Sequence, residues 1–64
     1  MSRQSDARRI AGDLDRTVNT SKGKVVAEVT CPEAADAKRV LAAFGREGWR
    51  TSLHGKVVRA EVSL

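Results

Sequence analysis

Residues 30–64 have the sequence TCPEAADAKRVLAAFGREGWRTSLHGKVVRAEVSL, and this stretch decides the fold. Thr30 and Glu33 have the spacing of a capping box, and Pro32 falls in the first turn, where its missing N–H costs nothing. The pattern therefore predicts a helix that begins at about Cys31. Behind this start, apolar residues recur at steps of three and four, which is typical of an amphipathic helix: Ala34, Ala37, Val40, Leu41 and Phe44.

Gly48 is the predicted end of this helix, because glycine readily adopts the left-handed conformation that many helices need just after the C-cap. On that assignment Trp49 follows at the next position and packs against Phe44, the contact that accompanies a Schellman ending. The sequence thus predicts that its two largest aromatic side chains meet at this joint.

Residues 49–53 and 56–64 alternate between apolar and polar side chains, which indicates two strands. Residues 54–55, His-Gly, form the predicted two-residue loop of a hairpin, because glycine accepts a positive φ freely and histidine tolerates it better than most residues. With this loop Thr51 lies opposite Val58, and the apolar residues of both strands share one face. A slip of one residue would break this match, so the alternation favours this register.

The remaining chain adds one strand and one helix to this stretch. Residues 24–30 are a predicted strand, and residues 19–23 are a predicted polar linker. Residues 1–19 are a predicted N-terminal amphipathic helix with Ser5 as its N-cap. Gly12 lies inside this helix and weakens it by about 1 kcal/mol relative to alanine.

The predicted order is therefore α-β-α-β-β in a single domain, residues 1–64, whose β-α-β-β core spans residues 24–64. We predict a small two-layer α+β domain in which both helices cover one face of a three-stranded sheet. The valine-rich last strand is the best candidate for the centre of that sheet.

The composition limits both the stability and the class of the protein. A chain of 64 residues buries only about 60% of its unfolded surface, so a homodimer or a tightly held partner is one expectation. One cysteine and one histidine leave no internal disulfide and no ordinary zinc site. Because the sequence has neither a membrane-spanning apolar run nor a signal-peptide pattern, we expect a cytoplasmic protein with no membrane partner.

Few residues have a placement that suggests catalysis. Cys31 lies at the predicted helix start, where a thiolate is stabilised, but the sequence has no CxxC partner and only His54 as a base. His54 is explained more simply as a turn residue, and Glu33 and Asp36 as first-turn acids that complement the helix dipole. We therefore expect no enzyme activity, no cofactor and no metal site.

The net charge of +4, from twelve Lys or Arg residues against eight acidic residues, favours polyanionic partners. In the predicted register Arg50 lies directly opposite Arg59, and an anion over this face would relieve their repulsion. The candidate residues for binding nucleic acid or a partner protein are cations of the sheet and the first helix: Lys24, Arg50, Lys56, Arg59, Arg8 and Arg9.

Two other interpretations of the same sheet face stay open. Glu28 and Glu61 would neutralise the arginines in an ordinary solvated surface. Val26 and Val57 would instead form the apolar centre of a protein interface, with the charges at its rim.

These observations predict a small accessory or regulatory protein that binds the phosphate backbone of nucleic acid, or a nucleic-acid-handling complex, through a basic surface. The alternative is a protein interaction module, such as a phage-type inhibitor that occludes a site on a larger host complex. Base recognition is not expected, because Trp49 and Phe44 belong to the predicted core and the sheet face has no other aromatic side chain to stack on bases.

Overall fold

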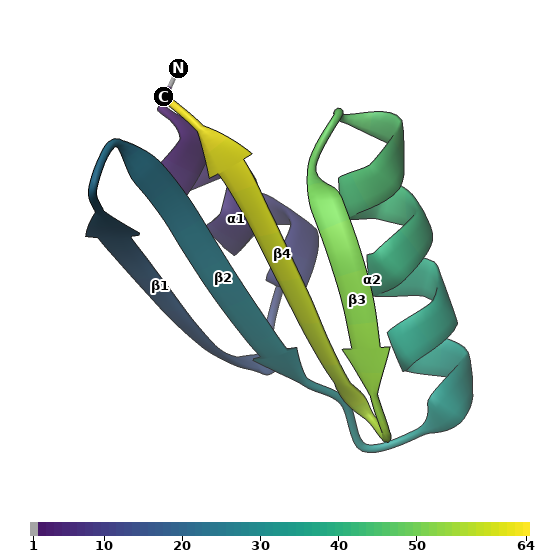
Figure 1. The fold of residues 1–64 in the computed structure, drawn as a ribbon. Helices are drawn as coiled ribbons and strands as arrows, with labels where there is room; N and C mark the ends of the chain where they lie inside the picture. Colours follow the sequence, from purple (N-terminus) through teal and green to yellow (C-terminus); the bar gives the residue numbers. More distant parts are fainter. Residues whose placement is uncertain (1) are drawn as a thin grey trace.

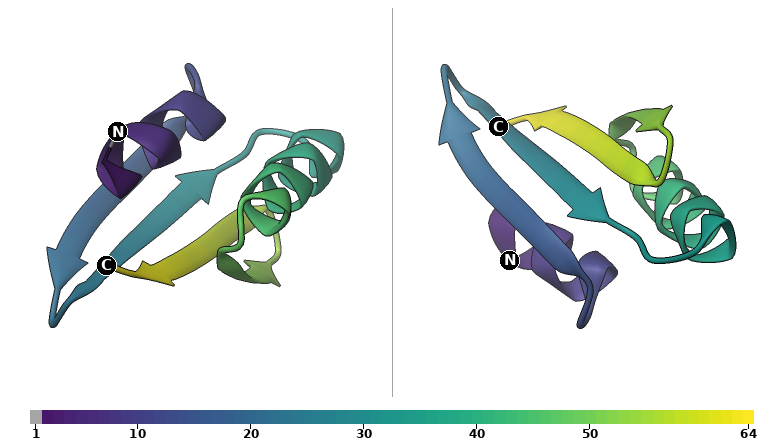
Figure 2. Two further views of the ribbon diagram at one scale, coloured as in Figure 1. Left: turned by 90° about the horizontal axis from the view of Figure 1, so that it is seen from above. Right: turned by 90° about the horizontal axis from the view of Figure 1, so that it is seen from below.

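Two helices and four strands form two layers in the computed structural model, which describes residues 2–64 (Figure 1). In chain order they are α1 (Arg3–Ala11), β1 (Asp15–Ser21), β2 (Lys24–Thr30), α2 (Ala34–Arg46), β3 (Arg50–His54) and β4 (Val57–Ser63). The strands make one antiparallel sheet in the order β1-β2-β4-β3. Both helices cover the same face of this sheet and leave the other face open (Figure 2).

The two-layer α+β class, the helices on one face and the place of the last strand between two others are confirmed. The predicted three-stranded sheet and the α-β-α-β-β order are wrong, because the segment before β2 adds a fourth strand at the sheet edge.

That extra strand, β1, comes from the segment predicted as the second half of the N-terminal helix. Helix α1 ends at Ala11, where Gly12 follows with a φ of 61° and its N–H donates to the Arg8 carbonyl. Residues 15–21 contain Thr17, Val18 and Thr20, three β-branched residues that favour the extended backbone of a strand. The N-cap is Ser2 and not Ser5, because the Ser2 hydroxyl accepts a hydrogen bond of 3.1 Å from the Ser5 N–H.

The predicted linker at residues 19–23 is the end of β1 and a tight turn. Lys22 and Gly23 have φ values of 53° and 73°, the two left-handed positions that a type I′ hairpin turn requires. Ser21 and Lys24 face each other on either side of this turn, and the register continues without a bulge to Asp15 and Thr30.

Helix α2 begins at Ala34, three residues later than predicted. Thr30 is a strand residue that pairs with Asp15 on one side and Val57 on the other, so it cannot cap the helix. The Cys31 N–H extends this pairing by donating to the Lys56 carbonyl over 2.9 Å. The residue before a proline is also pushed toward extended geometry, so the Cys31–Pro32 pair delays the helix.

The predicted end of α2 is confirmed. Gly48 has a φ of 87°, its N–H donates to the Gly45 carbonyl, and the Trp49 N–H donates to the Phe44 carbonyl, both over 3.1 Å. These two bonds define a Schellman motif. The rings of Phe44 and Trp49 meet edge to face, with centroids 4.9 Å apart and an interplanar angle of 64°.

The hairpin of β3 and β4 exists, but its turn lies one residue further on than predicted. His54 pairs with Val57, so the loop is Gly55–Lys56, and Thr51 lies opposite Ala60 instead of Val58. Gly55 has a φ of 64° at the first loop position, where a type II′ turn requires glycine. The resulting shift of two residues keeps every side chain on its predicted face, so the apolar alternation could not exclude it.

The core lies between the helices and the covered face of the sheet. Its largest fully buried side chains are Phe44, Val25, Val29, Val40 and Val58. Small residues fill the middle of the sheet, where Ala27 and Ala60 face each other and are both fully buried. Leu53 lies on the apolar face, as predicted. Because it belongs to β3, an edge strand, 45% of its surface stays exposed.

Candidate functional site

The open face of the sheet carries the side chains that alternate with the core residues. Lys24, Glu28, Arg59 and Arg50 all lie on this face and are exposed to solvent. A sheet with one packed and one solvated face is usual for antiparallel strands. Three of the six predicted binding residues, Lys24, Arg50 and Arg59, are therefore on one surface.

The predicted opposition of Arg50 and Arg59 is wrong. The two-residue shift puts Arg50 opposite Glu61 and puts Arg59 between Ser52 and Glu28. Arg59 forms an ion pair of 3.7 Å with Glu28. The predicted repulsion between Arg50 and Arg59 is thus absent, and Glu28 on the neighbouring strand supplies the counter-charge of Arg59.

Arg50 differs from Arg59, because it forms no ion pair with any residue from 2 to 64, although Glu61 is its cross-strand neighbour. It borders an open hollow of about 400 Å³ between the start of β3 and the end of β4. The hollow is lined by Lys24, Gly48, Arg50, Glu61, Val62 and Ser63. A smaller hollow of about 210 Å³ adjoins it along β3 and shares Arg50 and Glu61.

Four cations gather at the end of the molecule that holds this hollow, and we call Lys22, Lys24, Arg46 and Arg50 the basic end. The β1–β2 turn, the end of α2, the start of β3 and the end of β4 all lie at this end of the sheet (Figure 1). The Leu64 N–H donates to the Gly23 carbonyl over 2.8 Å and so holds the turn beside the end of β4.

The side chains of the basic end are exposed, and none of them forms a hydrogen bond or ion pair within the described part of the chain. Their charges are therefore available to a ligand without the loss of an internal contact. Arg46 was not among the predicted site residues; its position in the last turn before Gly48 was the available signal.

The opposite end of the molecule is more acidic. It holds the α1–β1 connection, the β2–α2 connection and the β3–β4 turn (Figure 1), with the acidic residues Asp13, Asp15, Glu33 and Asp36. Two of its cations contact the main chain: the Lys56 Nζ donates to the Pro32 carbonyl over 3.2 Å, and Arg16 donates to the Gly12 carbonyl over 3.3 Å. The predicted site residue Lys56 therefore lies far along the sheet from the basic end.

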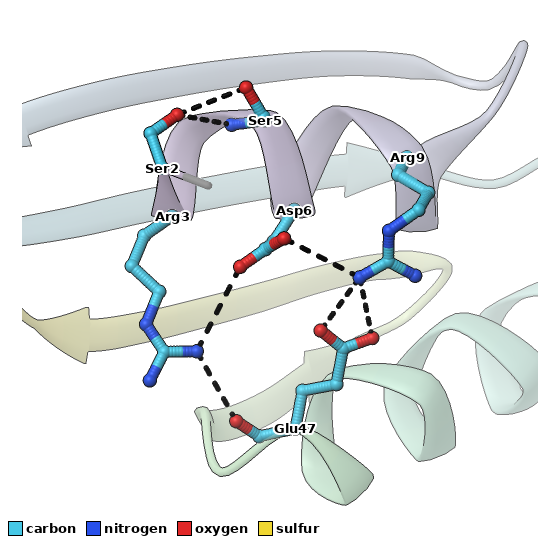
Figure 3. A network of polar contacts seen from close by, with 6 residues as sticks. All are labelled: Ser2, Arg3, Ser5, Asp6, Arg9 and Glu47. Atoms are coloured by element: carbon cyan, nitrogen blue, oxygen red, sulfur yellow. Dashed lines mark hydrogen bonds and ion pairs between the residues drawn. The ribbon is translucent and has the colours of Figure 1, made fainter.

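Arg8 and Arg9, the last two predicted site residues, are on α1 in the helix layer, behind the open face. Arg9 is held by Glu47, whose two carboxylate oxygens lie 2.7 and 2.8 Å from one guanidinium nitrogen (Figure 3). The hydrogen bond and charge of Glu47, with a smaller contribution from Asp6, raise the pKa of Arg9. Arg9 is thus part of a contact between the two helices, and the six predicted residues do not form one surface.

The same contact includes Arg3, which donates to the Glu47 carbonyl over 3.5 Å and lies 4.0 Å from Asp6 (Figure 3). These polar contacts fasten α1 to the C-terminal end of α2. They also keep Glu47 engaged, although it is next to Arg46 of the basic end and to Gly48, which lines the hollow.

Among the described residues no hydrogen bond joins Cys31 to His54, the thiol and the imidazole considered for catalysis. Cys31 is buried, and this burial is the main reason that the pKa of its thiol is raised; nearby Asp36 raises it further. His54 is a strand residue and not a turn residue, with its Nε2 3.3 Å from the Ser52 hydroxyl. Asp36 pairs with Arg39 over 3.6 Å. Within residues 2–64 no three His, Cys, Asp or Glu side chains are grouped as a metal site requires.

Cys31 gives a first testable prediction. Because the thiol is buried and its pKa is raised, we expect an aromatic disulfide reagent to label native protein far more slowly than urea-unfolded protein at neutral pH. The native state holds the thiol proton more tightly than the unfolded state. The contribution of Cys31 to stability is therefore constant at neutral pH and declines as pH rises through the ordinary titration range of a thiol. Equal labelling rates in the two states would contradict the burial.

Comparisons of the chain with protein-family models, with curated proteins and with solved structures found no match. In the described residues, neither helix has the length and apolar character that crossing a bilayer requires.

Proposed function

We propose that this is a small accessory or regulatory protein, without enzyme activity, that binds the phosphate backbone of nucleic acid through its basic end. The observation that carries the proposal is the gathering of Lys22, Lys24, Arg46 and Arg50 at one end of the sheet, where Lys24 and Arg50 line an open hollow. Among residues 2–64 none of these four exposed side chains has a hydrogen-bond or ion-pair partner. Cations of this kind bind phosphates and release condensed counterions, which gives affinity without sequence readout.

The distribution of charge along the sheet supports binding at the basic end and not at the opposite end. Arg16 and Lys56 at the opposite end donate to main-chain carbonyls, whereas the side chains of the basic end have no such partner in the described part of the chain. A ligand with dense negative charge is therefore attracted to one end of the molecule and repelled by the acidic residues at the other. The Ser63 hydroxyl and the Gly48 backbone in the hollow add neutral groups of the kind that commonly contact phosphate oxygens.

Base recognition is not part of the proposal. Phe44 is fully buried and Trp49 is 4% exposed, so neither aromatic side chain is available to stack on a base. Within residues 2–64 two strands separate α1 from α2, so the two helices do not form a helix-turn-helix reader.

The proposal is tested by titrating a labelled mixed-sequence DNA duplex and a single strand with the protein and following fluorescence anisotropy across a range of salt concentrations. The double variant Lys24→Ala/Arg50→Ala should weaken binding about tenfold or more at about 50 mM salt. It should also lower the slope of log affinity against log salt by about 2, because each lost phosphate contact lowers the slope by about 1. The loss should be similar for unrelated sequences.

A matched control is Arg8→Ala/Lys38→Ala, which removes the same charge from exposed, unpaired residues of the helices. It should change affinity and slope much less. An equal effect of the two double variants would mean that only net charge matters and that the basic end is no site. Absence of binding to either nucleic acid at low salt would overturn the proposal and favour an acidic protein surface as the ligand of the basic end.

A further inference from the structure

Among residues 2–64, no strand pairs with the outer edge of β1. This strand is seven residues long, pairs with β2 on one side only, and has every residue except Val18 exposed. Its pairing with β2 is continuous from Asp15 to Ser21, so no bulge twists the edge away from a partner. It contains neither proline nor lysine, the residues that commonly protect such edges.

The direction of its free backbone groups follows from the turn. Ser21 and Lys24 close a two-residue loop and therefore exchange both of their backbone hydrogen bonds. Every second residue of β1, counted back from Ser21, bonds to β2 in the same way. The N–H and C=O groups of the intervening residues, Arg16, Val18 and Thr20, point away from β2 along the outer edge.

We propose that this edge pairs with β1 of a second copy of the protein, antiparallel and across a twofold axis at Val18. Only this register overlaps all seven residues and keeps the helices of both copies on the same side of the joined sheet. It matches Arg16 with Thr20 of the second copy and Val18 with Val18. The three facing pairs form about six backbone hydrogen bonds, two for each pair.

The charges of the two copies are complementary in this arrangement. Antiparallel pairing brings the basic end of one copy beside the acidic end of the other. Asp15 of one copy then lies opposite Ser21 of the second copy. In that second copy Lys22 follows Ser21 in the chain, and Lys24 is the β2 residue paired with Ser21. A parallel arrangement would instead bring like charges together.

The other edge of the sheet is a poorer template. Strand β3 has five residues, and the same alternation from its two-residue loop leaves only Thr51 and Leu53 with outward backbone groups. The two edges therefore differ within one molecule, which provides an internal control.

The experiment measures molar mass by light scattering and sedimentation equilibrium over a range of concentrations. The wild type should move from 6.9 kDa toward twice that mass as concentration rises. Arg16→Pro removes an outward N–H that β2 does not need, and edge strands tolerate proline at such positions. It should raise the dimer dissociation constant about tenfold or more relative to Arg16→Ala, which loses the same side chain but keeps the N–H.

Hydrogen exchange gives a second readout on the unmodified protein, in case Arg16→Pro does not fold. In a dimer the amides of Arg16, Val18 and Thr20 become protected, and their protection increases with concentration. The amides of Thr51 and Leu53 should stay fast at all concentrations. A monomer at all concentrations, or fast exchange at all five amides, would overturn the proposal; a dimer unaffected by Arg16→Pro would place the interface elsewhere.

Discussion

Replacement of Trp49 by alanine is expected to lower the free energy of unfolding by about 3–5 kcal/mol. A domain of this size has only about 0.05–0.15 kcal/mol of stability per residue, so such a loss removes much or all of the total. The reason is the position of Trp49, which closes the Schellman motif, packs edge to face on Phe44 and is 4% exposed. Urea denaturation followed by far-UV circular dichroism measures the loss.

Trp49→Phe is the matched variant. The indole Nε1 is buried with no hydrogen-bond partner among the described residues, and an unsatisfied buried N–H costs about 1–3 kcal/mol. Phenylalanine keeps an aromatic ring against Phe44 and removes this group, so its net effect should stay within about 1.5 kcal/mol of the wild type. If Trp49→Ala were as stable as Trp49→Phe, the joint between α2 and β3 would not be part of the core.

The second large effect is expected from overpacking the centre of the sheet. Ala27 lies opposite Ala60, both side chains are fully buried, and the two helices pack over this face. Leucine at position 27 adds three carbon atoms where the layers meet, so Ala27→Leu should cost about 1–3 kcal/mol of unfolding free energy, or more if the helices are displaced. Thermal and urea unfolding of the variant measure this cost.

The control for this variant is Val26→Leu, one residue earlier on the same strand. Val26 is on the open face and only half-buried, so the extra carbon atom meets solvent and stability should change by less than about 0.5 kcal/mol. Equal costs at positions 26 and 27 would mean that the two faces of β2 are not packed differently.

Local signals in the sequence were sufficient to predict a feature where its backbone conformation strongly favours one residue type. Gly48 followed by Trp49 defined the end of α2, because glycine relieves the left-handed position and the spacing to Phe44 completes the motif. The alternation along β3 and β4 defined which side chains point toward the helices, although Leu53 on that face stays 45% exposed. The pattern could not define the register of the two strands, because a slip of two residues leaves that alternation unchanged.

Strand β1 was missed because its apolar residues are too few to establish a period. Leu14 and Val18 are four apart, which fits a helix, while only the pairing with β2 shows that Val18 is a strand residue. The Lys22–Gly23 turn gave only a weak signal of a hairpin, since lysine is an unusual residue at a positive φ.

The candidate site was predicted in part for a similar reason. Lys24 and Arg50 were placed on the same sheet face, and they line one hollow. Arg9 was a candidate on the first helix, and its engagement by Glu47 was missed because Glu47 is 38 residues away in the sequence. Contacts of that range depend on how the layers assemble, which charge and spacing alone do not specify.

The central place of β4 also determines when this protein can fold during synthesis. The inner neighbour of β2 is β4, which is synthesised only after residues 31–56. Until β4 is available, the sheet that joins the β1–β2 hairpin to the strand under α2 is not formed. A nascent chain that still holds residues 57–63 inside the ribosomal exit tunnel thus exposes Val25 and Val29 along an incomplete sheet. We expect little native structure before β4 emerges, and then a single cooperative step in which both layers form together.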